Sequence, residues 1–272
     1  MGRFDGWLIL TDLDGTLLRN DKSISEENRQ AIRRFQAEGG LFSFVTGRIP
    51  QGAKAVAEVI QPNAPCGHSN GGCIYDHRIQ KELWGRSVPP SAIAFAADVL
   101  AQFPSLGLIV CTHEDVYFHC KNEATEEFRC NEGFADVMRD MHTVDEPIAK
   151  IMFTTDSEQQ MQALMAQLPK HPSANEVSLI RSDVSYYEIL PKDACKGELI
   201  PPLSELTGVP VERIIAVGDN DNDASMLKAA GIGIAVANAS NAAKAAADHV
   251  MTITNEQHAI AYIIRELEKR AV

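Results

Sequence analysis

The sequence lacks long apolar runs, an excess of basic charge and a secretory leader, and each absence excludes a class of protein. Its 272 residues contain no stretch near the ~20 apolar residues of a membrane-spanning helix. Lys and Arg number 25 against 37 Asp and Glu, a net charge of −12, which argues against nucleic acid or an anionic membrane as partner. The N-terminus shows no charged segment followed by a sufficient apolar one. We therefore expect a cytoplasmic protein with no nucleic acid or membrane partner.

Paired cysteines are also lacking. The six cysteines are scattered without a Cys-x-x-Cys motif, which in a chain of this length indicates reduced, mostly buried thiols. A zinc site can be imagined from His113, His119, Cys120 and Cys130, but their spacing matches no common ligand pattern. With 45% hydrophobic and 23% charged residues, the composition is that of an ordinary globular protein with one large domain or two modest ones.

What the sequence contains is an apolar stretch that ends abruptly in two carboxylates, Asp12 and Asp14, before Gly15 and Thr16. Residues 7–11 are typical of a buried parallel strand, and a turn at Gly15 would place both carboxylates in one small volume. Anions that close repel each other unless a cation or a shared proton intervenes. Because Mg²⁺ takes hard oxygen ligands beside phosphate and water, the stretch predicts a magnesium site for a phosphorylated substrate. The structural alternative is an Asp-rich turn.

Strands and helices alternate in the outer parts of the chain, a pattern typical of a parallel sheet with right-handed crossovers. The core strands are predicted at residues 7–11, 41–45, 213–217, 232–236 and 249–253. The middle section differs and predicts a separate α+β unit inserted in the first domain. Its helices are predicted at residues 91–103, 123–141 and 157–168, and two strands at 176–181 and 185–190 form a hairpin.

Polar residues follow the predicted core strands or begin helices. These features are Asp12 with Asp14, Thr46 with Gly47, Lys196, and Asp219 with Asp223. Ligands bind at the carboxyl ends of strands in open α/β sheets, so these residues could converge on one crevice. Taken singly, they have plain alternatives: a strand-to-helix turn, a solvated lysine and an acidic helix cap. Calcium binding by residues 219, 221 and 223 is disfavoured, because the glycine and glutamate of an EF-hand loop are missing.

Each residue type suits phosphoryl transfer. One carboxylate can act as the nucleophile, and a second carboxyl group can protonate the leaving oxygen and later deprotonate water. A metal and a lysine can neutralise charge on the transferring group. A threonine hydroxyl and a glycine N–H at a helix N-terminus can hold phosphate oxygens. Asp219 would supply a further oxygen for the metal.

The chain resembles the haloacid dehalogenase superfamily in four motifs. In order they are Asp12-Leu13-Asp14-Gly15-Thr16, Thr46-Gly47-Arg48, Lys196-Gly197 and Gly218-Asp219-Asn220-Asp221-Asn222-Asp223. The Ser69-Asn70-Gly71 turn and the large insert after it resemble the Cof-type phosphatases. The resemblance implies an α/β fold with a Rossmann-like parallel-sheet catalytic core, residues 1–84 and 191–272. Residues 85–190 would be an inserted, mobile α+β cap domain that sets substrate specificity.

The resemblance also implies roles for individual residues. Asp12 would be the nucleophile and Asp14 the general acid and base. Mg²⁺ would be held by the Asp12 carboxylate, the Asp14 backbone carbonyl and Asp219. One departure from the family is Cys195, because relatives often carry a polar residue before the lysine.

The phosphate group would have its own set of contacts in this resemblance. They are Thr46, Gly47, Lys196 and Asn222, while Asp223 would orient Lys196 or the waters on the metal. We expect the core to contact only the phosphate and the metal, so the cap should choose the substrate. Polar or aromatic candidates there are His113, His119, Arg181, Tyr186 and Tyr187, each as readily a packing or surface residue.

The expected function is Mg²⁺-dependent hydrolysis of small-molecule phosphomonoesters through an aspartyl-phosphate, by a monomer or homodimer. Relatives act on sugar phosphates, pyridoxal phosphate and flavin mononucleotide, and the sequence does not choose among them. One alternative is a phosphotransferase or phosphomutase, in which another hydroxyl accepts the phosphoryl group. Another is a non-catalytic sensor of phosphorylated metabolites. A dehalogenase is disfavoured, because a halide leaving group does not need the proton that Asp14 could give.

Overall fold

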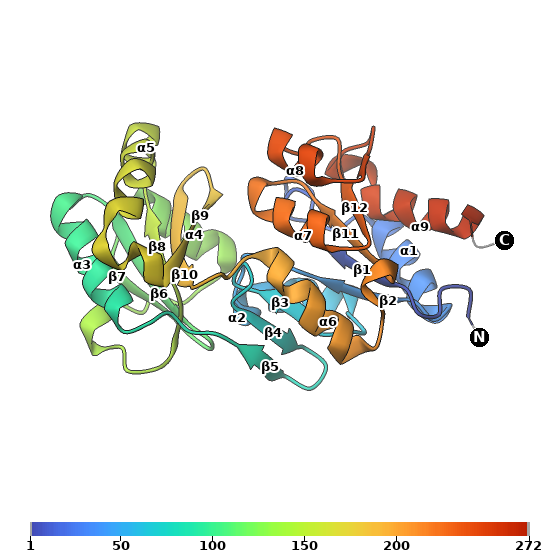
Figure 1. The fold of residues 1–272 in the computed structure, drawn as a ribbon, viewed down its shortest axis with the longest axis horizontal. Coiled ribbons are helices and arrows are strands. Elements are labelled where there is room, and N and C mark those ends of the chain that lie inside the picture. The colour runs from blue at the N-terminus through green and yellow to red at the C-terminus, as the bar shows by residue number, and fades with distance from the viewer. Residues whose placement is uncertain (1, 271–272) are drawn as a thin grey trace. The chain divides into compact units, whose positions relative to one another are not determined.

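The protein, described by a computed structural model over residues 2–270, forms two compact units (Figure 1). The first unit contains the chain up to Gly47, Lys54–Trp84 and the chain from Cys195 onward. The second contains Arg48–Ala53 and Gly85–Ala194. Among the described residues, no helix combines the length and the apolar character that crossing a membrane requires.

The first unit is built on a five-stranded parallel sheet in the order β13-β12-β11-β1-β2. The strands are β1 (Leu8–Thr11), β2 (Leu41–Phe44), β11 (Ile214–Gly218), β12 (Ile232–Ala235) and β13 (His249–Val250). Every residue of β1 and β11 is buried, as continuous apolar runs in a sheet covered on both faces require. The predicted α/β fold with a parallel-sheet core is confirmed.

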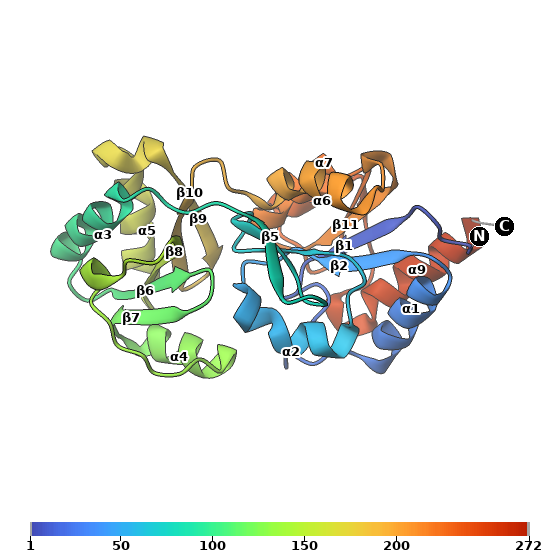
Figure 2. The ribbon, with the colours of Figure 1, turned by 90° about the horizontal axis from the view of Figure 1, so that it is seen from below.

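Helices cover both faces of this sheet. Helices α1 (Glu26–Ala37) and α9 (Ala259–Arg270) lie on one face, and α6 (Ile200–Thr207) and α7 (Ala224–Ala229) lie on the other (Figure 2). Helix α8 (Asn241–Ala246) follows β12. Both faces of the central strands β1 and β11 are therefore shielded from water, and the edge at the carboxyl ends of the strands carries the loops.

The first unit also contains a small three-stranded sheet and most of one further helix. The sheet has the order β3-β4-β5, with β3 (Cys66–His68), β4 (Cys73–Asp76) and β5 (Lys81–Gly85). Helix α2 (Pro50–Ile60) has residues in both units. The turn between β3 and β4 contains Ser69, Asn70, Gly71 and Gly72.

The second unit is an antiparallel sheet in the order β7-β6-β8-β10-β9. Its strands are β6 (Gly107–Thr112), β7 (Val116–Cys120), β8 (Ile148–Thr154), β9 (Val177–Asp183) and β10 (Tyr186–Pro191), and its helices are α3 (Ser91–Gln102), α4 (Glu123–Glu132) and α5 (Glu158–Gln167). Alternate residues of β8 serve two cores. Phe153 packs with Phe95 of α3 and Met161 of α5, whereas Met152 packs with Phe134.

Two predicted helices differ from the observed ones. The helix predicted over 123–141 ends at Glu132, because Gly133 adopts left-handed backbone (φ 72°) and closes the helix with hydrogen bonds from its N–H. A separate 3-10 turn then forms at Met141–Thr143. The segment predicted as one helix from Lys196 begins instead as a 3-10 turn, Lys196–Leu199, before α6.

Candidate active site

The candidate site lies at the carboxyl edge of the parallel sheet. Thr11, the last residue of β1, pairs with Val217 of β11 on one side and with Phe44 of β2 on the other. The three segments that follow these residues therefore leave the sheet at the same edge. They carry Asp12, Asp219 and Thr46, respectively. Parallel register thus brings together residues that are far apart in the sequence.

Lys196 connects the buried charges of the site. Its side chain is 1% exposed, and its Nζ donates hydrogen bonds to Asp12 Oδ1 at 2.7 Å and to Asp223 Oδ1 at 2.5 Å. Burial alone would lower the pKa of this lysine, but the carboxylates of Asp12 and Asp223 outweigh burial and raise the pKa. Lys196 therefore stays positively charged.

Asp223 shapes the loop after β11. Its Oδ2 accepts the backbone N–H groups of Asp219 and Asn220, both at 2.9 Å. Gly218 is packed so closely against it that an added Cβ would lie 2.6 Å from the Cβ of Asp223. Both carboxylate oxygens of Asp223 are thus occupied by protein donors, one from Lys196 and one from the loop.

Three buried or half-buried carboxylates, Asp12, Asp219 and Asp223, have oxygens that lie within 4.8 Å of one another. Thr16 Oγ1 donates to Asp219 Oδ1 at 2.6 Å. The approach of Asp219 needs a glycine at position 15, where φ is +83° and a Cβ would lie 2.4 Å from Asp219 Oδ2.

This carboxylate cluster has more negative charge than Lys196 can balance. Burial first, and then repulsion from Asp223, raise the pKa of Asp12 well above its usual range, against the pull of Lys196. Burial and the same repulsion raise the pKa of Asp219 to about 6. Hard oxygen donors with a net negative charge are the donor set that a divalent cation such as Mg²⁺ takes. The residues therefore fit a metal site.

Asp14 differs from Asp12 in its surroundings. Its Oδ1 accepts from Lys22 Nζ at 2.7 Å, and its side chain is 37% exposed, whereas the side chain of Asp12 is only 7% exposed. Contact with water allows the Asp14 carboxyl group to exchange a proton, while the buried Asp12 is held by Lys196. The two carboxylates of the motif thus have different environments, which suits them to different tasks.

Three of the four residues expected to contact phosphate lie close to Asn70 or to the strand before it. Asn222 Nδ2 donates to Asn70 Oδ1 at 3.0 Å, and a Cβ on Gly47 would lie 3.0 Å from Asn70 Nδ2. The Thr46 N–H donates to the backbone oxygen of Gly67 at 3.0 Å. Thr46, Gly47 and Asn222 are therefore tied to the segment around the turn between β3 and β4.

Sequence reasoning assigned no role in the site to Asn70, Thr16 or Lys22. A signal existed for Asn70, because two polar residues before two glycines make an unusual turn between short strands. Thr16 was visible in the first motif, although its partner Asp219 lies 203 residues away. Lys22 had no distinguishing signal, since a single exposed lysine after a turn is common.

Two of the four imagined zinc ligands have surroundings of a different kind. His119 Nδ1 accepts the N–H of Met141 at 3.1 Å, and Cys130 is an exposed thiol. All six cysteines are free, and Cys66, Cys73 and Cys111 are buried. Burial raises the pKa of Cys66 to about 12, so that thiol stays protonated.

A family model described as haloacid dehalogenase-like hydrolase matches residues 9–264. The chain belongs to this family. Two Bacillus subtilis proteins of the family are similar along nearly their whole length. The 5-amino-6-(5-phospho-D-ribitylamino)uracil phosphatase YitU is 29% identical over 96% of this chain and 97% of its own, and phosphatase YwpJ is 30% identical over 96% and 99%.

The fold agrees with this assignment. The crystal structure of a haloacid dehalogenase-like hydrolase from Bacteroides thetaiotaomicron superposes with a TM-score of 0.83, covering 97% of this chain and 99% of that one at 24% identity. The predicted haloacid dehalogenase-like fold and Cof-type family are therefore confirmed. The prediction of an enzyme of the phosphatase class, a phosphoric monoester hydrolase, is confirmed as well.

Proposed function

We propose that this haloacid dehalogenase-like hydrolase is a Mg²⁺-dependent phosphatase that cleaves small phosphomonoesters through an aspartyl-phosphate on Asp12. The observation that carries the proposal is the buried Asp12 carboxylate, held by Lys196 at 2.7 Å and within 4.8 Å of Asp219 and Asp223 at the carboxyl edge of the sheet. A carboxylate so placed can be both a nucleophile and a metal ligand.

The proposed metal ligands are the Asp12 carboxylate, the Asp14 backbone carbonyl and the Asp219 carboxylate. Asp223 is less suited, because Lys196 and two backbone N–H groups already occupy its oxygens. When bound, Mg²⁺ would neutralise charge on the phosphoryl group. The hydrogen bond from Thr16 holds Asp219 in place for this role.

The chemistry is divided between the two carboxylates of the first motif. An oxygen of Asp12 attacks phosphorus, the bond from phosphorus to the alcohol oxygen breaks, and Asp14 gives that oxygen its proton. Asp14 then removes a proton from water, which attacks the same phosphorus. Phosphate leaves and the Asp12 carboxylate is restored. Lys196 stabilises Asp12 as an anion before attack and the phosphate oxygens afterwards.

Phosphate oxygens would be held by the Thr46 hydroxyl, the Gly47 N–H, Lys196 and Asn222. Asp223 would position Lys196, since it shares the lysine with Asp12. All of these residues belong to the first unit. We therefore also propose that the second unit acts as the cap that selects the organic part of the substrate.

We propose a small phosphorylated metabolite as substrate, of the sugar phosphate, pyridoxal phosphate or flavin mononucleotide class. The similar protein YitU is named for a phosphorylated ribityl compound, which makes an acyclic sugar phosphate attached to a heterocycle a member of the test panel. The acidic net charge of −12 disfavours large polyanions, so nucleic acid is not proposed.

The test is phosphate release from such a panel and from p-nitrophenyl phosphate, with Mg²⁺ and with EDTA. We expect hydrolysis only with the metal, and a loss of roughly 10⁴-fold or more in Asp12→Asn. Asp248→Asn is the matched control. Asp248 lies directly before β13 and accepts a hydrogen bond from the N–H of Gly233 in β12, at the amino ends of these strands. Substantial turnover by folded Asp12→Asn would refute the mechanism, and transfer to added alcohols without phosphate release would favour a phosphotransferase.

A further inference from the structure

The turn between β3 and β4 is more constrained than a simple connection requires. Ser69 and Asn70 both adopt left-handed backbone, with φ of 53° and 52°, and both are at most 1% exposed. Non-glycine residues adopt this conformation at a cost in free energy, and such residues persist where the surroundings hold them, often at functional sites. The buried hydroxyl of Ser69 also has no hydrogen-bond partner among the described residues. Because both residues are buried in a disfavoured backbone conformation, contacts with the surroundings of the turn must hold it in place.

Asn70 makes those contacts with the residues proposed to bind phosphate. Its N–H donates to the Thr46 backbone oxygen at 3.1 Å, and its Oδ1 accepts from Asn222 Nδ2 at 3.0 Å. Its amide lies so close to Gly47 that an added Cβ there would be 3.0 Å from Nδ2. One side chain and its backbone thus meet three of the four proposed phosphate contacts.

The next residue of the turn packs on the residue directly before the fourth, Lys196. Gly71 has φ of +104°, and a Cβ on it would lie 2.2 Å from the backbone oxygen of Cys195, directly before Lys196. Only a glycine allows the turn to pack on this backbone. The turn therefore contacts all three chain segments that bring phosphate-binding groups to the sheet edge.

Asn222 depends on this turn for its orientation. Within residues 2–270, its bond to Asn70 is the one hydrogen bond of its side chain, and its buried Oδ1 has no partner. An amide has two N–H donors. With one donor directed at Asn70, the plane of the amide is set and the second donor is left for a ligand.

We infer that Asn70 is a positioning residue for the phosphate site, which orients the Asn222 amide toward a phosphate oxygen without touching phosphate itself. The inference rests on the proposed function, because it takes Asn222 as a phosphate contact. Its rival is a purely structural role, since asparagine is also the residue that best tolerates left-handed backbone after glycine. The two roles predict different kinetics.

The experiment is a double-mutant cycle with Asn70→Gly and Asn222→Ala. Glycine keeps the left-handed backbone and removes only the amide. We expect each single variant to lower kcat/KM for p-nitrophenyl phosphate, and to raise the inhibition constant of inorganic phosphate, about tenfold, as for one lost hydrogen bond. The double variant should be no worse than Asn222→Ala, because Asn70 acts through Asn222.

Two further variants separate positioning from stability. Asn70→Ala should be less stable than Asn70→Gly, because alanine rarely adopts φ near 52°, yet it should show the same kinetics. Asn63→Ala is the matched control: its side chain accepts from the Phe42 N–H at 2.8 Å and donates to the Gly40 oxygen at 3.0 Å. It should lose stability with unchanged KM and kcat.

The outcomes distinguish the inference from the function beneath it. Additive losses in the double variant, or losses that follow stability across Asn70→Gly, Asn70→Ala and Asn63→Ala, would overturn the positioning role while the phosphatase stands. A wild-type protein that neither releases phosphate from any ester nor binds inorganic phosphate in calorimetry would overturn the proposed function first, and the inference with it. Coupled losses confined to the Asn70 and Asn222 variants would support both.

Discussion

Each unit of the molecule contains a lysine that is buried beside acidic side chains. In the second unit one lysine faces one carboxylate, whereas in the first unit one lysine faces a cluster with more negative than positive charge. In the second unit, Lys150 of β8 donates to Glu188 of β10 at 2.9 Å, and their side chains are 5% and 2% exposed. Ser182 donates to the same Glu188 oxygen at 2.7 Å. In the first unit, Lys196 is shared by Asp12 and Asp223, with Asp219 close by.

The difference lies in where the partners come from. Strands β8 and β10 are neighbours in one sheet, so Lys150 and Glu188 form a balanced pair within regular structure. Burial lowers the pKa of Lys150, but Glu188 together with Cys111 and Glu132 outweighs burial and raises the pKa, as the acidic neighbours do at Lys196. Lys196 instead joins the loops that follow β1 and β11, where the carboxylates leave a surplus of negative charge. In a balanced pair each buried charge compensates the other, so that removing one partner destabilises the fold, whereas a surplus attracts a cation and prepares a site for chemistry.

The largest expected effect comes from removing the lysine of the unbalanced cluster. Lys196→Met should lower kcat/KM roughly 10³-fold, because the phosphoryl group loses a fixed positive charge and Asp12 loses the group that favours its ionised form. The double variant Lys196→Met/Asp223→Asn, which restores the net charge of the wild-type cluster, should recover stability but not activity. Steady-state kinetics and urea unfolding on the same samples check this. Recovery of activity in the double variant would mean that Lys196 only compensates charge, and would contradict its proposed role in catalysis.

For the pair of Lys150 and Glu188, the main expected effect is on stability and not on catalysis. Lys150→Met leaves Glu188 buried without its cation, which should cost about 3–5 kcal/mol in the free energy of unfolding. Lys150→Met/Glu188→Gln should recover most of that loss, because neither member of the pair is charged any longer and Gln still accepts from Ser182. Urea unfolding followed by circular dichroism measures both. If the double variant is as unstable as the single one, the pair is needed for more than charge balance.

The sequence predicted the sheet of the first unit well for a physical reason. Its strands are continuous apolar runs, and polar residues such as Asp12 and Asp219 come directly after them. Parallel register then brings those residues to one edge, so their proximity follows from the fold class. For Lys196 the family resemblance added a prediction, that Asp223 would orient this lysine or the waters on the metal, and Lys196 does donate a hydrogen bond to Asp223.

What the sequence could not show depends on contacts between distant residues. Asn70 and Asn222 are 152 residues apart, and neither periodicity nor composition encodes their hydrogen bond. Gly133 is a different case. Glycine is the residue that commonly ends a helix, but the sequence pattern predicts a helix that continues through it to residue 141. There, the left-handed closing conformation outweighed the helical pattern of the residues beyond it.

That glycine offers a smaller test in the second unit. Gly133→Ala should cost about 1 kcal/mol in the free energy of unfolding, because alanine is disfavoured at φ 72°, while a Cβ there meets nothing within 4 Å. Hydrolysis of p-nitrophenyl phosphate should keep its kcat. Gly15→Ala is the contrasting variant in the first unit, since a Cβ there would lie 2.4 Å from Asp219 Oδ2. Gly15→Ala should therefore lower turnover, and equal effects of the two variants on turnover would contradict the assignment of the chemistry to the first unit.

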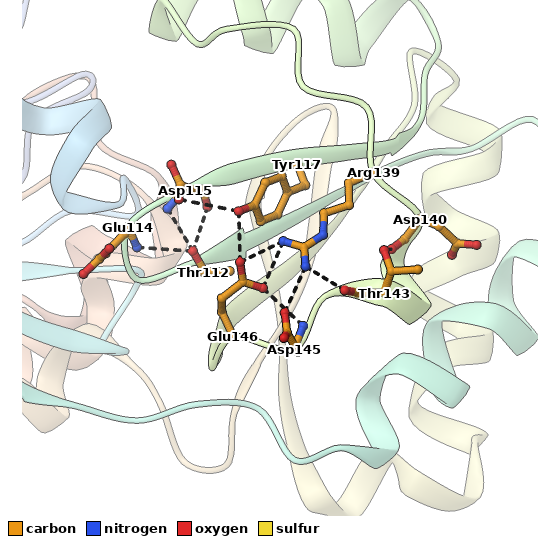
Figure 3. A network of polar contacts seen from close by, with 9 residues as sticks. All are labelled: Thr112, Glu114, Asp115, Tyr117, Arg139, Asp140, Thr143, Asp145 and Glu146. Atoms are coloured by element: carbon orange, nitrogen blue, oxygen red, sulfur yellow. Dashed lines mark hydrogen bonds and ion pairs between the residues drawn. The ribbon is translucent and has the colours of Figure 1, made fainter.

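The second unit also carries a network of charges on its surface, centred on Arg139 (Figure 3). Its guanidinium donates to both Glu146 oxygens at 2.8 and 3.0 Å and to the Thr143 backbone oxygen at 2.6 Å. It also lies 4.7 Å from the centre of the Tyr117 ring. The network joins β7 to the loop that precedes β8, and exposure to water makes it weaker than either buried cluster.

The smallest predicted effect is a dependence on pH in this network. The hydrogen bonds from Arg139 hold the pKa of Glu146 at about 2, below its ordinary 4.5. A lowered pKa in the folded state means that the pair stabilises the protein fully above about pH 4.5 and less as the pH falls toward 2. Arg139→Ala should therefore lower the urea midpoint at pH 6, and its difference from wild type should shrink by pH 3. In a Glu146→Gln/Asp145→Asn background, where both acidic partners of Arg139 are neutral, the effect of Arg139→Ala should lose that pH dependence. A difference that stays constant in the wild-type background would mean that Arg139 acts through its contacts with Thr143 and Tyr117, and not through the charge of Glu146.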